Sequence, residues 1–217
     1  MRALLRKHPV SLALAAGWTL SWTALTALGP RYHADLLALG STSLPRLAAW
    51  PVTVPVSAVL VAEDLAVWLV AVVLGVAAVE ARLGWRRALV LVSGVHIGAT
   101  ILSQGLLGLR VVLGDAPPEA LHQLDVGPSY VVIAGLVGAA MLSRSRLGRV
   151  AALAALAVGV PELIEGLPQL DLAATGHVAA VLIAVPLAHR LRSVVRSDSG
   201  RRSPAWQDLS EPGSHGS

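Results

Sequence analysis

The sequence contains no cysteine and no phenylalanine, and only 14% of its 217 residues are charged. The absence of cysteine excludes disulfide bonds and thiolate chemistry. Charge is scarce because 55% of the chain is hydrophobic, with a mean hydropathy of +0.68. That is more apolar side chain than a soluble domain of this length usually carries. Long runs of Leu, Ala and Val supply the excess, and they favour membrane-spanning helices over the alternating strands of a β-barrel.

The net charge is +4 and the pI is about 10.6, values that would also suit a nucleic-acid-binding protein. The basic residues, however, lie in short clusters between apolar runs, which is typical of the loops of a membrane protein. We therefore expect the lipid bilayer as a partner and no nucleic acid.

A helix needs about 20 mostly apolar residues to cross a bilayer. Six segments approach or exceed this length: 10–29, 56–79, 88–107, 126–143, 147–166 and 170–189. We predict an all-α, polytopic membrane domain of six transmembrane helices over residues 1–194. A disordered cytoplasmic tail is predicted over 195–217, which is rich in Ser, Gly, Pro and Arg. The first apolar run is too long for a cleaved signal peptide, so we expect a retained signal-anchor.

The basic residues also predict the orientation. Fourteen of the 17 Lys and Arg residues lie before the first span, after the second, after the fourth and after the sixth. The intervening loops hold only Arg31, Arg46 and Arg110. Since cytoplasmic loops are enriched in Lys and Arg, we expect a multi-pass protein of the plasma or inner membrane with both termini in the cytoplasm.

Ionisable side chains at membrane depth are costly, so each is a candidate functional residue. The candidates at such depth are Glu63, Asp64, His96 and His177. His96 is near the middle of its span and is interpreted as structural. We expect no cofactor and no metal site, because the last outer loop offers only acidic residues that suit solvent exposure.

Three polar residues are expected at similar depths in the membrane. Counted from the outer ends of their spans, Ser129 lies roughly 6 Å deep, His177 roughly 10 Å and Asp64 roughly 12 Å. A serine becomes a nucleophile when a base such as histidine is adjacent. Taken singly, Ser129 more often bonds the backbone of its own helix, and His177 is more often a packing residue. Asp64 could orient His177 or reach an outer cavity.

Small residues indicate how these helices could meet. Gly176, Ala180 and Ala184 follow a small-xxx-small spacing in the sixth span, and Gly135 and Ala139 do so in the fourth. Such spacing permits close approach of helix backbones. Packing of the two spans would bring Ser129 and His177 within hydrogen-bond reach.

Over roughly residues 8–190 the sequence resembles the rhomboid family of intramembrane serine proteases. Glu80-Ala81-Arg82-Leu83-Gly84 is similar to the E-x-R-x-G loop of that family. Gly127-Pro128-Ser129-Tyr130 stands where rhomboids have G-x-S-G, and Gly176-His177 stands in the A-H-x-x-G-x-x-x-G motif. The resemblance implies a six-helix rhomboid-like bundle, with Ser129 as nucleophile and His177 as general base.

Three positions depart from the family pattern. Asp64 and Trp68 stand where rhomboids have the H-x-x-x-N pair that helps to bind the oxyanion. An ionised carboxylate would repel that oxyanion, and an indole is far bulkier than an amide. Tyr130 replaces the glycine after the nucleophile, and we expect its bulk to hinder close helix packing and substrate access. Gly127, Tyr130 and Asp64 are the auxiliary candidates of the site.

Two functions compete on this reading. One is a divergent intramembrane serine protease, a hydrolase that cleaves membrane-anchored proteins near the outer face through a Ser129–His177 dyad. The other is an inactive rhomboid-like pseudoprotease that binds transmembrane clients. A third, less favoured reading is a channel or transporter that moves protons through Glu63, Asp64 and His96.

Overall fold

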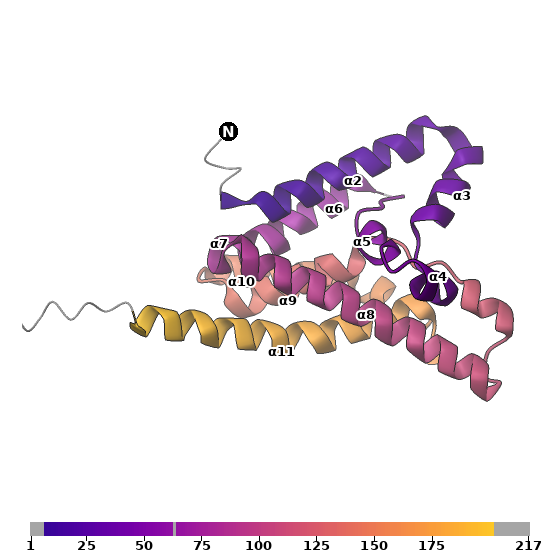
Figure 1. The fold of residues 1–217 in the computed structure, drawn as a ribbon. Helices are drawn as coiled ribbons and strands as arrows, with labels where there is room; N and C mark the ends of the chain where they lie inside the picture. The colour runs from indigo at the N-terminus through magenta and orange to yellow at the C-terminus, as the bar shows by residue number, and fades with distance from the viewer. Residues whose placement is uncertain (1–6, 63, 202–217) are drawn as a thin grey trace, which may run out of the picture.

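A computed structural model shows a helical bundle (Figure 1) and describes residues 7–62 and 64–201. Glu63 therefore lies outside the described residues, as do 202–217 of the predicted tail. The main helices are α2 (Pro9–Ala27), α6 (Leu65–Val72), α7 (Ala78–Leu83), α8 (Trp85–Leu113), α9 (Ser129–Leu142), α10 (Arg146–Ile164) and α11 (Leu172–Arg201). A π-helical segment, η1 (Val73–Ala77), joins α6 to α7, so that these three form one rod. The connection between α2 and α6 contains three shorter helices: α3 (Gly29–Gly40), α4 (Leu44–Ala49) and α5 (Thr53–Ser57). A 3-10 turn, η2 (Pro118–His122), precedes α9, and another, η3 (Leu167–Gln169), precedes α11.

In the described part of the chain, five helical segments are long and apolar enough to cross a membrane: Pro9–Ala27, Leu65–Leu83, Trp85–Leu113, Arg146–Ile164 and Leu172–Val194. The sixth, α9, has only 14 residues, which corresponds to about 21 Å. Most of its side chains are buried against the other helices. Because the surrounding helices meet the lipid, α9 need not match the thickness of the bilayer. The fold is thus an all-α polytopic bundle, as predicted from the sequence.

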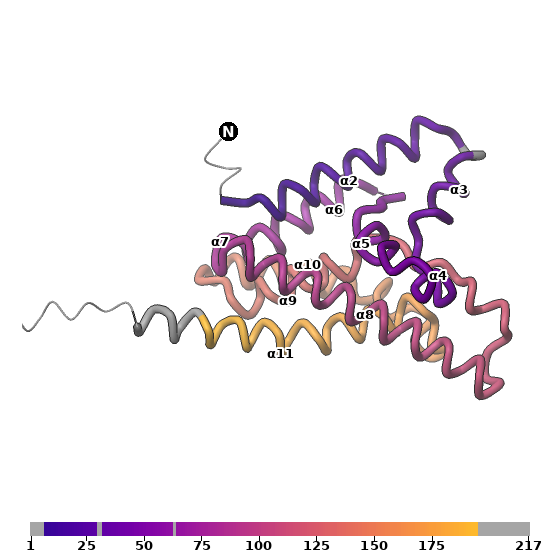
Figure 2. Tube along the Cα trace, viewed as in Figure 1, coloured from indigo at the N-terminus to yellow at the C-terminus, as the bar shows by residue number. Residues whose placement is uncertain are grey.

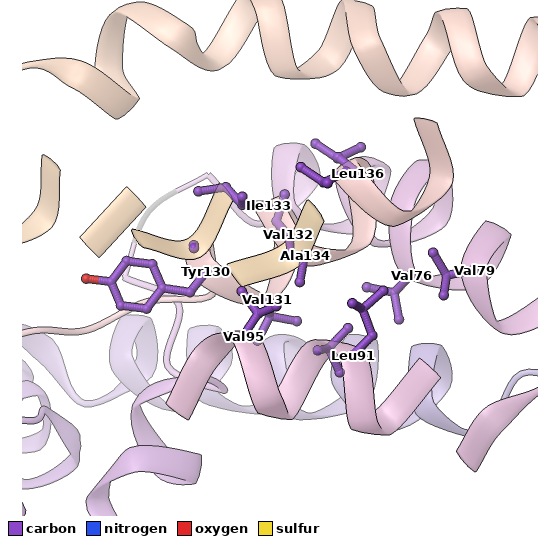
Figure 3. Close-up of a cluster of buried hydrophobic side chains, with 14 of the residues drawn as sticks. Val76, Val79, Leu91, Val95, Tyr130, Val131, Val132, Ile133, Ala134 and Leu136 are labelled. Atoms are coloured by element: carbon purple, nitrogen blue, oxygen red, sulfur yellow. The ribbon is translucent and has the colours of Figure 1, made fainter. Parts of the chain in front are cut away.

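The core of the bundle surrounds α9, which packs against α8, α10, α11 and η1. Figure 3 shows Val76 and Val79 of the second span and Leu91 and Val95 of α8 gathered beside the apolar side chains of α9. Trp18 of α2 is also fully buried, with its Nε1–H donating to the oxygen of Ala58 at 3.0 Å.

The second span begins at Leu65 and not at residue 56 as predicted. The apolar residues before Leu65 do not form part of this helix, because their main-chain oxygens accept hydrogen bonds from other parts of the bundle. Ser57 accepts from the N–H of Gly127 at 3.2 Å, and Val59 accepts from the hydroxyl of Ser21 at 2.7 Å. At the other terminus α11 extends to Arg201, past residue 195 where the tail was predicted to begin. Figure 2 traces the path of the chain from α2 to α11.

The π-helical turn lies where the second span crosses α9. A methyl group on Gly75 would come within 2.8 Å of the carbonyl carbon of Gly135, and one on Gly135 within 2.7 Å of the nitrogen of Val76. The two backbones are therefore in direct contact, which only glycine permits. The small residue Gly135 thus faces the second span, whereas the sequence pattern predicted that it would face the sixth.

A buried carboxylate ties the ends of α2 and α7 together. Glu80 accepts hydrogen bonds from the N–H groups of Val10 and Ser11 at 2.8 and 3.0 Å, and from the hydroxyl of Ser11 at 2.6 Å. The first N–H groups of a helix have no partner within the helix, so Glu80 supplies the cap that α2 lacks from its own sequence.

Candidate active site

The candidate nucleophile, Ser129, is the first residue of α9. A tight turn presents it there: Gly127 has φ +118, which residues with a side chain rarely adopt. Pro128 occupies the N-cap position. The N–H of Gly127 donates to the oxygen of Ser57, so the turn is fixed to the connection that precedes the second span. Gly127 is therefore the residue that allows α9 to begin at the serine.

The structure brings Ser129 and His177 together. His177 lies in the second turn of α11, and its Nε2 is 3.0 Å from the Oγ of Ser129. Both side chains are partly buried. Helices α9 and α11 pack along one another, so the predicted meeting of the fourth and sixth spans is confirmed.

The hydrogen bond made by the second ring nitrogen of His177 indicates which tautomer of the imidazole is present. Its Nδ1 is 3.0 Å from the main-chain oxygen of Leu163 on α10. A carbonyl oxygen only accepts, so in the neutral ring Nδ1 carries the hydrogen and Nε2 has the free lone pair. Nε2 can then accept the proton of the Ser129 hydroxyl, which is the arrangement that a general base requires. Leu163, and not Asp64, is the hydrogen-bond partner of this nitrogen.

Tyr130 does not obstruct the approach of α11, contrary to the expectation from its size. Its side chain is 2% exposed and its phenol occupies the space beside Gly176, where any side chain would overlap it. The ring contacts His177 edge to face, with centroids 5.6 Å apart, and contacts His96 on the other side at 5.7 Å. The hydroxyl donates to the Oδ2 of Asp125 at 3.2 Å. Gly176 therefore compensates for the glycine that Tyr130 replaces.

An apolar cavity of about 620 Å³ opens beside Ser129. It lies between the second span, α9 and α10. Among its lining residues are Trp68, Leu74, Ser129, Ile133, Gly159 and Leu163. Tyr130 does not line it. An extended or helical apolar chain entering this cavity would meet the hydroxyl of Ser129 at one end.

The residues at the family's oxyanion positions lie at the N-terminal end of the second span. Asp64 is exposed at the N-cap of α6, and Trp68 lines the cavity. Neither offers an amide or an imidazole. The first N–H groups of α9, beginning with that of Ser129, have no acceptor within the helix. Together with the positive end of the helix dipole, these N–H groups favour negative charge at this end of α9.

His96 is buried and is held by main-chain and hydroxyl groups near the end of α5. Its Nε2 lies 2.8 Å from the oxygen of Val54 and 3.3 Å from the hydroxyl of Ser57. Asp64 lines a pocket with Glu162 that adjoins the cavity beside Ser129. His96 lines a different pocket, which counts against a continuous proton path through the two.

Sequence reasoning did not find the oxygen of Leu163, because a main-chain acceptor has no signature in the residue type. It also did not pair Tyr130 with Asp125. The five-residue separation of these two around a Gly-Pro turn was the available signal, since a turn brings such positions to one side.

These features define the chain as an all-α polytopic membrane protein with a serine and a histidine in contact inside the bundle. A family model described as rhomboid-like protein matches residues 3–197. The chain belongs to this rhomboid-like family. Neither a curated protein nor a solved structure matches it at the significance threshold applied.

Proposed function

We propose that the protein is a divergent intramembrane serine protease in which Ser129 is the nucleophile and His177 the general base. The observation that supports this most directly is the 3.0 Å contact between Ser129 Oγ and His177 Nε2 together with the bond from Nδ1 to Leu163. A serine that served only helix packing would bond its own backbone. Here it contacts a base whose tautomer is fixed for proton acceptance.

In the proposed reaction Oγ of Ser129 attacks the carbonyl carbon of a peptide bond while Nε2 of His177 takes the hydroxyl proton. The oxyanion that forms faces the N–H groups at the start of α9. The imidazolium then protonates the leaving amine as the C–N bond breaks, which leaves an acyl-serine. Water, deprotonated by the same imidazole, attacks the ester, and the serine regains its proton from His177 as the acid is released.

The cavity beside Ser129 favours a membrane-anchored substrate. Its lining is almost wholly apolar, so it suits a segment that leaves lipid and not one that leaves water. The positive-inside pattern favours an orientation with the N-terminal end of α9 at the outer face and both termini in the cytoplasm. Cleavage would then occur near the outer face of a plasma or inner membrane.

The competing function is a pseudoprotease that binds transmembrane clients in the same cavity. The side chains of Asp64 and Trp68 favour it, since neither can bind an oxyanion as the family's pair does. Removal of a single oxyanion donor typically costs about 10²–10³ in rate. Only the backbone donors of α9 would remain, which predicts a slow enzyme if it is active.

A fluorophosphonate probe in detergent separates the two functions. Wild-type protein, Ser129→Ala and His177→Ala are compared after circular dichroism has shown equal helicity and thermal stability. Labelling of the wild type that is lost in both variants supports the protease. Ser193→Ala is the matched control, because Ser193 is exposed on α11 and its hydroxyl bonds the oxygen of Arg190 in the same helix, and it should label as the wild type does. Absence of labelling in all four folded proteins would favour the client-binding function.

A further inference from the structure

A second polar site lies at the end of the bundle opposite to Ser129. A pocket of about 250 Å³ is formed where α7 and α9 end, α10 begins and α11 passes. Its lining includes four arginines, one from each of four separate segments: Arg82, Arg144, Arg149 and Arg192. Ser143 also lines it. The chain thus gathers at one point arginines that are far apart in the sequence.

Among the residues that the structure describes, no carboxylate lines this pocket. Within the described residues none of the four guanidinium groups forms an ion pair with an acidic side chain. Arg82 is half-buried, whereas Arg144, Arg149 and Arg192 are exposed at the rim. Four like charges around one small volume repel one another unless an anion lies between them. The positive charge of the pocket is therefore not balanced by the described residues.

The main chain adds to the positive potential of the pocket. Helix α10 begins at Arg146, directly after the segment that carries Ser143 and Arg144. The hydroxyl of Ser145 caps this helix by accepting from the N–H of Gly148 at 3.3 Å. The positive end of the α10 dipole thus lies beside the four guanidinium groups, and both favour the same kind of ligand.

We propose that this pocket is a binding site for a phosphate group, which in the membrane is supplied by the headgroup of an anionic phospholipid. Arginine forks match phosphate oxygens in bidentate geometry. The pocket lies at the ends of membrane-spanning helices, at the level where headgroups are found, and basic pockets between helices at this level suit such headgroups. The bound headgroup bridges α7, α10 and α11 and neutralises their arginines.

The test uses full-length protein and native mass spectrometry with phosphatidylglycerol or phosphatidylcholine added to the detergent-purified sample. The variant is Arg149→Gln with Arg192→Gln. Its matched control is Arg146→Gln with Arg190→Gln, which removes one arginine from each of the same two helices but none that lines the pocket. Both pairs change the net charge equally. Circular dichroism and thermal melting confirm that both variants fold.

We expect wild type and control to retain phosphatidylglycerol in preference to phosphatidylcholine. The pocket variant should bind phosphatidylglycerol about 30-fold more weakly, because each arginine near an anionic headgroup contributes a factor of about five. Equal losses in the pocket variant and the control would overturn the proposal, since they would show a diffuse effect of net charge. Unchanged binding in the pocket variant would also overturn it.

A competition arm identifies the source of the phosphate. Inorganic phosphate and glycerophosphoglycerol, which carry the anion without acyl chains, are added against bound phosphatidylglycerol. Failure of both to compete while the pocket variant loses binding supports a lipid site. Displacement by inorganic phosphate at comparable concentration supports the anion site and assigns it to a soluble ligand.

Discussion

The phenol of Tyr130 packs against the bare Cα of Gly176, one residue before His177 in the chain. This contact joins the start of α9 to the second turn of α11, and the ring of Tyr130 then lies edge to face against the imidazole. The serine and the histidine are thus held together by the two residues that follow and precede them.

Gly176→Ala should therefore separate α9 from α11. The added methyl group overlaps the phenol, and overpacking of this kind costs about 1–3 kcal/mol of unfolding free energy. We expect a lower melting temperature and loss of fluorophosphonate labelling. In a Tyr130→Gly background the overlap is absent, so Gly176→Ala should cost less stability there than in the wild type. An equal cost in both backgrounds would show that the phenol is not what the methyl group displaces.

The carboxyl group of Asp125 should make stability depend on pH. Burial raises the pKa of Asp125 to about 6, an effect that the hydrogen bond from Tyr130 partly offsets. Between pH 4 and pH 6 the folded state keeps a proton that the unfolded state has lost, so unfolding free energy decreases as pH rises. The decrease amounts to at most about 3 kcal/mol and is complete above pH 6.

Asp125→Asn is the matched variant for this measurement, because an amide oxygen still accepts from Tyr130 but does not titrate. Denaturation in mixed micelles at pH 4, 5, 6 and 7 should give a flatter profile for Asp125→Asn than for the wild type. Parallel profiles would assign the pH dependence to other groups.

The crossing of the second span and α9 should not tolerate a methyl group. Gly75→Ala and Gly135→Ala each place a Cβ within 3 Å of backbone atoms that cannot rotate away, and we expect a loss of several kcal/mol, or no folded protein. Gly105→Ala is the control on α8, because nothing lies within 4 Å of its added methyl group. It should stabilise the helix by up to about 1 kcal/mol. Denaturant titration in micelles measures all three.

Glu80 should contribute to stability through the cap of α2 and not through catalysis. Glu80→Ala leaves the N–H groups of Val10 and Ser11 without an acceptor in the interior, at a cost of about 2–4 kcal/mol. Ser11→Ala removes one bond of the three and should cost about 1 kcal/mol. Protein of either variant that remains folded should keep the fluorophosphonate labelling of the wild type per folded molecule. A selective loss of labelling would instead connect this end of the bundle to Ser129.

The apolar runs sufficed to predict the spans because lipid imposes a length and a composition on each helix. They misplaced the start of the second span. The stretch around Ser57 is as apolar as a membrane-spanning helix, but its main chain is hydrogen-bonded to other parts of the bundle. Counting depth predicted that Ser129 and His177 could meet. The small-residue spacing did not predict which helix Gly135 faces, because small residues permit close packing but do not determine which helix packs there. The role of Leu163 could not be predicted from the sequence, because it depends on the main-chain carbonyl group, which every residue has.

The π-helical turn within the second span has a consequence for how this protein can change in evolution. Such a turn holds one residue more than an α-helical turn, so the segments before and after it are out of phase by about 100° relative to a regular helix. Trp68 can then face the cavity while Glu80 faces α2. Deletion of a single residue between Val73 and Ala77 would rotate one of these side chains away from its place, although every remaining amino acid would be unchanged.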